Sequence, residues 1–589
     1  MTVRRSAATR QAAIAMAVLL LVAACTATDS TTAPVTVAPT TPPPISSTTT
    51  GQVEPTTTTT TSTTVPAPRD CTIDHEPGEP VFESLDESDL VGASLLLSGQ
   101  YFSCADEVVI APADDLAVVA VAAQLADATD STLLLHDPDS SAIVNAALTR
   151  LGPERITLVE LDGDWLADNS AEIVEIRGIP TDLGDVARRA MGSIARVGMA
   201  GTGPDTIAAV LRSIVDGRTT TVPTRQSGVC DPDSQTATEA IEDAAAGRTA
   251  HGEVWLVDVC SPGLALLAAA SLGSEGTVLL IDGRDLRTGR QLVQAVNSGP
   301  SGINQIHIAG EVSEEADWQL DTLLAGDELP GGGLLLFPGR RIVALYGNPS
   351  TRFLGVLGEQ GVEEAIERAR EVAEPYGADG LEVLPAFEII ASVASVSAGR
   401  DGDYSNEMSV DQLRPWVEAA GDGGVYVVLD LQSGRSDFLA QAKNYEELLL
   451  LPHVGLALDP EWRLKPNQVH LEQIGSVGAE EVNRVVEWLA GLVRENRLPQ
   501  KLFIVHQFRL DMVTNRSLIN KPPELAMMVH ADGQGPIATK YTTYSTLTGR
   551  PDADQWWWGW KNFYDEDSPT PSPEQVLELD PLPVYVSYQ

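Results

Sequence analysis

Aromatic and basic residues are scarce in this chain. Of its 589 residues, 5% are Phe, Tyr or Trp, and 38 Lys and Arg stand against 83 Asp and Glu, giving a formal charge of -45. So acidic a surface repels a phosphate backbone, which excludes a basic nucleic-acid binder. A hydrophobic share of 43% beside so many charges excludes a polytopic membrane protein. The length allows two or three folded units with sizeable cores.

The apolar segment near the N-terminus, residues 12–24, is too short to span a bilayer and follows Arg4, Arg5 and Arg10, as in an export signal. It ends in VAAC at Cys25, which resembles the bacterial lipobox, where the cysteine is lipidated. We therefore expect residues 1–25 to be a lipoprotein signal and Cys25 to anchor the protein to the outer face of the cell membrane. The alternative is ordinary signal-peptidase cleavage, which leaves Cys25 as a thiol.

Residues 26–70 lack the side chains that build a core, because they are almost entirely Thr, Pro, Ser, Ala and Val. This composition predicts a disordered, partly polyproline-II linker that acts as a tether.

The chain has five cysteines, and the four that follow Cys25 are Cys71, Cys104, Cys230 and Cys260. In an exported protein an even count indicates two disulfides, with three possible pairings. We favour Cys71 with Cys104 and Cys230 with Cys260. No CxxC or His/Cys spacing indicates zinc.

Residues 108–159 alternate apolar strands with helical patterns in the order strand, helix, strand, helix, strand, and the same order returns from residue 254. Alternation of this kind predicts a parallel sheet. We expect residues 71–335 to form a doubly wound α/β region built from two copies of one unit.

The strand-to-helix turns APADDLA (111–117) and SPGLA (261–265) resemble the turn of the type 2 cell-wall-binding repeat, and residues 196–210 resemble its opening segment. Neither copy keeps both the Phe and the Asp of that turn. The resemblance implies binding to cell-wall polymer. The alternative is a flavodoxin-like spacer without a ligand.

Gly and Pro at 331–333 and 338–339 separate this region from residues 340–589, where eight apolar runs alternate with helical patterns. Eight strand-helix units in this length predict an α/β fold of the (β/α)8 TIM-barrel type. The expected strands are 342–347, 382–390, 425–431, 454–460, 501–507, 525–532, 555–563 and 583–588.

The period of two along barrel strands turns Asp430, Glu388 and Asp459 inward, at the C-terminal mouth where barrel enzymes keep their active sites. Asp459 and Glu461 form a D-x-E pair that resembles the end of the acidic motif in chitinase-type and lysozyme-type glycosidases. The earlier Asp of the chitinase pattern falls on Ala457. The resemblance implies that Glu461 is a general acid, which Asp459 positions. From their places on the strands, we expect Asp430 or Glu388 to be the base or nucleophile, and Asp532 and His530 are further candidates for the second carboxylate or for positioning the sugar. Alternatively, Asp459 only caps a loop.

Candidate substrate-binding residues complete the predicted mouth. They are Trp462, Gln507, His530, Asp532, Trp558, Trp560, Lys561 and Tyr346. We expect no metal and no cofactor, because short ligand spacings and nucleotide-binding motifs are missing. A metal site of Glu388, Asp430, His506, His530 and Asp532 is an alternative, as is a purely structural role for the two histidines.

The segments VYVVLDLQSGRSDFL, HVGLALDPEWRL, KLFIVHQF, VHADGQG and WWGWKNFYDED resemble a family of uncharacterised exported lipoproteins of high-GC Gram-positive bacteria, to which no reaction is assigned. The sequence as a whole predicts a surface lipoprotein with a glycoside-hydrolase-like barrel that acts on cell-envelope or environmental polysaccharide. The alternative is a non-catalytic protein that binds cell wall or glycan.

Overall fold

The computed structural model describes residues 71–177, 238–299 and 302–589, except for positions 74, 76, 169, 239, 240, 243, 274 and 275. These residues belong to one compact unit, Ala67–Gln589. The predicted signal, the predicted lipidation site Cys25, the predicted linker, residues 196–210 and Cys230 lie outside the described residues.

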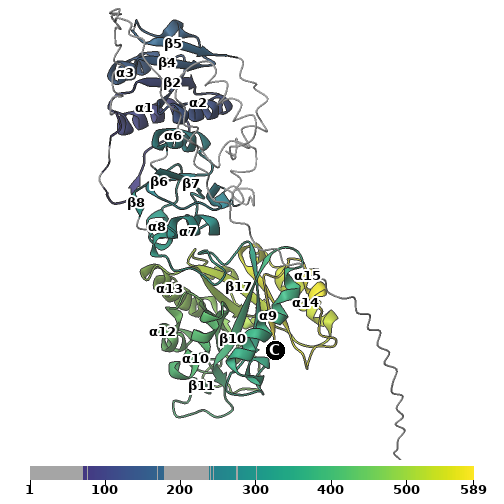
Figure 1. Ribbon diagram of the computed structural model, residues 1–589. Helices are drawn as coiled ribbons and strands as arrows, with labels where there is room; N and C mark the ends of the chain where they lie inside the picture. Colours follow the sequence, from purple (N-terminus) through teal and green to yellow (C-terminus); the bar gives the residue numbers. More distant parts are fainter. Residues whose placement is uncertain are drawn as a thin grey trace, which may run out of the picture. The chain divides into compact units, whose positions relative to one another are not determined.

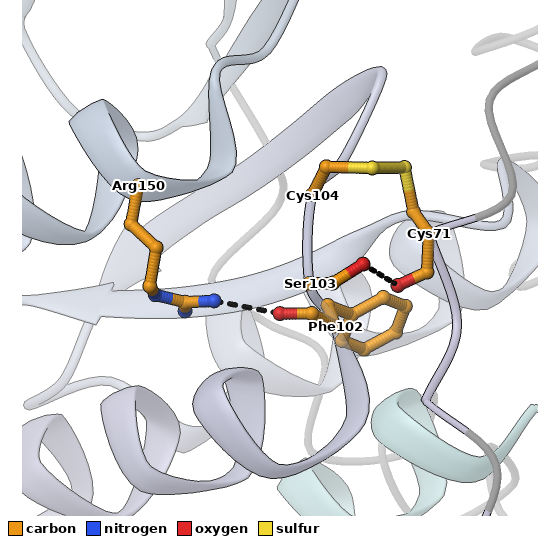
Figure 2. The surroundings of a disulfide bond; sticks show 5 residues. All are labelled: Cys71, Phe102, Ser103, Cys104 and Arg150. Carbon is orange, nitrogen blue, oxygen red and sulfur yellow. Dashed lines mark hydrogen bonds between the residues drawn. A yellow bond between two sulfur atoms is a disulfide. The ribbon is translucent and has the colours of Figure 1, made fainter.

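Cys71 and Cys104 form a disulfide with Cα atoms 4.8 Å apart (Figure 2), the pairing favoured above. Next to it, Ser103 N donates to the Cys71 carbonyl at 2.8 Å and Arg150 Nη1 donates to the Phe102 carbonyl at 2.6 Å. The bridge ties the start of the described chain to the end of helix α1 (Leu90–Tyr101).

Two four-stranded parallel sheets form the N-terminal region. In the first, the order is β3-β2-β4-β5, and in the second it is β7-β6-β8-β1, so the first strand of each predicted unit lies between its second and third. The predicted strand and helix order is confirmed, whereas the duplication stays a prediction. The elements are β1 (Val81–Phe82), β2 (Glu107–Pro112), α2 (Leu116–Ala128), β3 (Thr132–His136), α3 (Ser141–Leu151), β4 (Arg155–Val159), β5 (Glu172–Ile176), β6 (Gly252–Asp258), α6 (Pro262–Leu272), β7 (Gly276–Ile281), α7 (Arg290–Asn297), β8 (Ile303–Ala309) and α8 (Ala316–Ala325).

Helix α6 packs against both sheets and against α1 and α2, as Figure 1 shows. It is apolar on all sides, as a helix enclosed between layers must be. A single hydrophobic core therefore contains residues of both sheets.

Residues 340–589 form the predicted barrel, in which eight parallel strands close because β19 pairs with β9. The strands are β9 (Arg340–Gly347), β10 (Glu382–Ala394), β12 (Tyr426–Leu431), β13 (Val454–Leu458), β15 (Lys501–His506), β17 (Leu525–Ala531), β18 (Trp557–Asn562) and β19 (Tyr585–Tyr588), with β11 (Ser405–Glu407) antiparallel to β10 and a small pair β14 (Val477–Gly478) and β16 (Val513–Thr514) outside. The helices of this region are α9 (Val362–Ala373), α10 (Val410–Asp422), α11 (Phe438–Ala442), α12 (Glu446–Leu449), α13 (Ala479–Glu495), α14 (Ile537–Thr548) and α15 (Pro573–Leu577), and Figure 1 labels all of them except α11.

The alternation along these strands divides the barrel into two cores. Val427 and Leu429 join the core under the helices, while Tyr426 and Val428 join the interior core. Small interior residues such as Ala457 allow the large Tyr426 to fit within the ring of strands. Leu336 and Phe337, just before β9, also belong to this interior core, so apolar residues fill the barrel at the N-terminal ends of the strands. The polar interior residues lie nearer the C-terminal ends.

Within the residues that the structure describes, none of the helices has the length and apolar character needed to cross a membrane.

Candidate active site

Four strands of the barrel, β10, β12, β15 and β17, place one polar residue each at the mouth, and β13 lies between β12 and β15. Glu388 lies on the interior face of β10, Asp430 on that of β12, His506 on that of β15 and His530 on that of β17. All four are fully buried. Register explains their proximity, because His506 pairs directly with His530 across the two strands.

His506 bridges two carboxylates. Its Nε2 lies 2.7 Å from Glu388 Oε1, and its Nδ1 lies 3.0 Å from Asp532 Oδ2. Burial opposes charge on the imidazole, but the carboxylates of Glu388 and Asp430 outweigh it and raise the pKa of His506 well above its usual value. Burial likewise opposes ionisation of Glu388, yet the charge of His506 and its hydrogen bond bring the pKa of Glu388 to about 2.

Glu388, Asp430 and His530 each have a further partner on another strand of the barrel. Tyr585 donates to Glu388 Oε2 at 2.9 Å, and Tyr346 donates to Asp430 Oδ2 at 2.9 Å. His530 Nε2 lies 3.2 Å from the Ser587 hydroxyl. Burial lowers the pKa of His530 to about 3, so this ring is neutral.

Several buried polar atoms at the mouth have no hydrogen-bond partner within residues 302–589, all of which are described. They are Asp430 Oδ1, His530 Nδ1 and Asp532 Oδ1. Buried polar atoms are nearly always paired, since leaving one unpaired costs about 1–3 kcal/mol. Three such atoms at the barrel mouth indicate a binding site for a ligand or ion that would pair with them.

Lys561, on the interior face of β18, is buried with its Nζ 3.3 Å from the centroid of the Tyr346 ring. This cation lies within the acidic mouth, where it favours ionisation of Glu461 and Asp430. The predicted role of Tyr346 as a stacking face is not met, since its ring is covered by Lys561 and its hydroxyl is bound to Asp430.

Asp459 and Glu461 follow β13. The Asp459 carboxylate accepts from the backbone N–H of Glu461 at 3.3 Å and so caps the short helix η7 (Pro460–Trp462), as the loop-cap alternative proposed. Burial, with the Asp532 charge second, raises the pKa of Glu461 to about 7. Burial, with Glu461 second, raises the pKa of Asp459 well above its usual value. Glu461 is half-buried, whereas Asp459 is buried, so Glu461 is the more exposed residue of the D-x-E pair.

The assignment of Trp558 and Trp560 to the mouth is wrong. Both belong to the core under the helices, where the Trp560 ring packs edge-on against Tyr544 and its Nε1 donates to Asn562. The alternation along β18 turns Lys561 inward and therefore turns these two outward.

Two other predicted binding residues lie near the mouth in different surroundings. Gln507 is buried and accepts from Arg516 Nη1 at 3.0 Å, so its amide is committed to a structural network. Trp462 is half-buried, packs edge-on against His470, and its Nε1 has no partner within residues 302–589.

Sequence reasoning missed Tyr585 and Ser587 on β19. Both face the barrel interior, where they bind Glu388 and His530. The signal was present, since Tyr585 and Ser587 alternate with the helix-facing Val586 along a strand whose interior face had not been assigned.

Comparison of the chain with known protein-family models found no match, and a search of curated proteins found none either.

Proposed function

We propose that the protein is a surface-anchored hydrolase whose barrel cleaves glycosidic bonds in cell-envelope or environmental polysaccharide, with Glu461 as the general acid. The observation that carries the proposal is the position of Glu461, half-buried at the barrel mouth beside a cluster of buried carboxylates.

The environment of Glu461 supports this role. A general acid must hold a proton near neutral pH, and a pKa of about 7 meets that need. Proton donation from its carboxyl group to the glycosidic oxygen would assist departure of the leaving sugar. Asp459 fixes the Glu461 backbone through the 3.3 Å hydrogen bond and acts as a positioning residue.

The second carboxylate is best supplied by Asp532. Its ion pair with His506 at 3.0 Å keeps it ionised, its Oδ1 has no partner within residues 302–589, and it is more exposed than Glu388. Glu388 is tied to Tyr585 and His506, which makes it a poor base. In this part of the proposal Asp532 replaces Asp430 and Glu388, the residues expected from the sequence.

Anchoring belongs to the same proposal. A lipid on Cys25 would hold the chain to the outer face of the membrane, and the N-terminal sheets would bind wall polymer. Mass spectrometry of the N-terminal peptide tests the lipid, which we expect to be absent in Cys25→Ala.

The test of the activity is hydrolysis of a panel of envelope glycans and peptidoglycan by residues 71–589. We expect sugar release by the wild type and a loss of at least ~100-fold in Glu461→Gln, the scale for a general acid. The matched control is Glu472→Gln, an exposed glutamate in the loop after η7, which we expect to keep full activity.

A second candidate function is glycan binding without cleavage. The observation that favours it is the cap formed by Asp459, which gives the D-x-E pair a structural role. Glycan binding by both wild type and Glu461→Gln, with no sugar release by either, would establish this alternative.

A further inference from the structure

Four buried side chains lie at the mouth, and three of them direct one atom each toward a common centre. These atoms are Glu388 Oε1, His506 Nε2 and His530 Nδ1, and Asp430 Oδ1 lies outside this group. His506 Nε2 lies 2.7 Å from Glu388 Oε1 and 3.8 Å from Asp430 Oδ1, and His530 Nδ1 lies 3.8 Å from Glu388 Oε1. One ligand atom from each of Glu388, His506 and His530 lies within 4.8 Å of the others.

The other polar atom of each side chain is held from outside this centre. Asp532 binds His506 Nδ1, Ser587 binds His530 Nε2, Tyr585 binds Glu388 Oε2 and Tyr346 binds Asp430 Oδ2. Partners of this kind fix the ring tautomers and carboxylate orientations of metal ligands. With Nδ1–H of His506 donated to Asp532 and Nε2–H of His530 donated to Ser587, both remaining ring nitrogens present lone pairs to the centre.

Hydrogen bonds between the side chains of residues 302–589 alone leave two buried polar atoms of this cluster without a partner. A doubly protonated His506 can donate to Glu388 and Asp532, yet Asp430 Oδ1 and His530 Nδ1 stay buried without partners within residues 302–589. A cation at the centre satisfies both, since each is a lone-pair donor.

Charge favours the same conclusion. Five carboxyl groups gather at the mouth, whereas Lys561 is held against the Tyr346 ring and donates no hydrogen bond to any of them within residues 302–589. The five are Glu388, Asp430, Asp459, Glu461 and Asp532. The pKa values of Asp459 and Glu461 are raised, so the buried charge that a divalent ion would offset is chiefly that of Glu388 and Asp532.

We propose that Glu388, Asp430, His506 and His530 form a binding site for one divalent first-row transition-metal ion, of which Zn²⁺ is the probe. Two imidazoles with two carboxylates suit such an ion better than Mg²⁺ or Ca²⁺. Ligands at about 2.0–2.2 Å from Zn²⁺ stand a little over 3 Å apart, so small movements would bring Glu388, His506 and His530 into place, and Asp430 would have to approach further. This proposal replaces the sequence-based expectation of no metal, and it does not rest on the proposed reaction.

The test uses the purified full chain, stripped with a chelator and titrated with Zn²⁺ by calorimetry and elemental analysis. We expect one tightly bound equivalent that is lost in Asp430→Asn and in His530→Gln. Asp532→Asn should weaken binding about 10–100-fold, as removal of a ligand's outer partner does. The matched control is Asp403→Asn, in a group of half-buried and exposed acids with Asp401 and Glu407, which should leave the tight equivalent unchanged.

A second measurement protects the test against variants that fail to fold. In the wild-type chain, ¹⁵N signals from two of the eight histidines should shift on addition of Zn²⁺. The proposal is overturned if no equivalent binds, if no histidine signal responds, or if binding survives both ligand variants and disappears in Asp403→Asn. Loss of glycan hydrolysis in Glu461→Gln is a separate readout, so each proposal can fail alone.

Discussion

Two regions of the molecule each bury a histidine between two acids, and they differ in what surrounds it. In the N-terminal region, His307 of β8 lies 2.7 Å from Glu83 and 3.3 Å from Glu253. In the barrel, His506 lies 2.7 Å from Glu388 and 3.0 Å from Asp532.

Around His307, one of the two acids also binds other side chains. Glu253 also accepts from the Tyr101 hydroxyl at 2.5 Å and pairs with His75 at 2.6 Å, and the Trp255 ring stacks on His307. These contacts join β1, β6, β8 and the segment fixed by the disulfide. His307 Nε2 also has no hydrogen-bond partner within the described residues, although it lies 3.3 Å from Glu253. Around His506, by contrast, partners lie on the outside, and unpaired atoms of three side chains, Asp430, His530 and Asp532, lie together at the mouth. A buried histidine between acids is therefore not in itself a functional site, and the grouping of several unpaired atoms beside it makes the difference.

The largest expected difference between the two regions is the loss of folding stability when each histidine is replaced by alanine. His506→Ala leaves Glu388 with the Tyr585 hydroxyl and Asp532 with no side-chain partner within residues 302–589, both buried, and we expect about 3–5 kcal/mol of destabilisation in the metal-free chain. His307→Ala leaves acids that are 14% exposed, of which Glu253 keeps Tyr101 and His75, so about 1–3 kcal/mol is expected. Thermal unfolding measures both. Equal losses would contradict the distinction.

A second prediction concerns Glu461 at the barrel mouth, whose ionisation should make the stability of the protein depend on pH. Its folded pKa of about 7 lies above its usual 4.5, so the stability it contributes is fully present below about 4.5 and is lost as pH rises through about 7. Gln cannot ionise, so Glu461→Gln should be more stable than wild type at about pH 9, by up to about 3 kcal/mol before solvent screening, and no more stable at about pH 4. Denaturant unfolding at the two pH values measures the difference. A constant difference between the two pH values would show that Glu461 titrates normally.

A smaller effect is expected from the space beside His530. A Cβ at Gly559 would lie 2.9 Å from His530 Cδ2 and 3.2 Å from Met528 Sδ. Gly559→Ala should therefore displace the ring and lower Zn²⁺ affinity about tenfold, on the scale of a disturbed outer partner. Gly491→Ala in α13, where a Cβ meets nothing within 4 Å, is the control and should leave affinity unchanged. Equal affinities in the two variants would remove His530 from the site.

Much of the fold and part of the site could be predicted from the sequence. Period-two alternation placed Glu388, Asp430 and His530 on the interior face, because the polar residues at the mouth share that face with Ala386, Val428 and Met528, one strand each. The run of Trp residues at 556–558 and Trp560 offered no such separation, since both faces of β18 receive a Trp. Trp560 and Lys561 are adjacent on one strand, so they cannot both face the mouth.

The side-chain contacts between distant strands of the barrel could not be predicted from the sequence. The contact of His506 with Glu388 joins positions 118 residues apart and depends on the closure and stagger of the strands. The outer partners Tyr585 and Ser587 depend on the same closure, because β19 meets β9 only in the folded ring.

The central claim, that Glu461 is the general acid of a barrel hydrolase, is tested most directly by the pH dependence of kcat/KM on the glycan that the wild type cleaves best. The account predicts that kcat/KM falls about tenfold per pH unit above about 7, as Glu461 loses its proton, and that Glu461→Gln lacks this fall along with most of the activity. A wild-type fall that persists unchanged in Glu461→Gln, at undiminished activity, would contradict it.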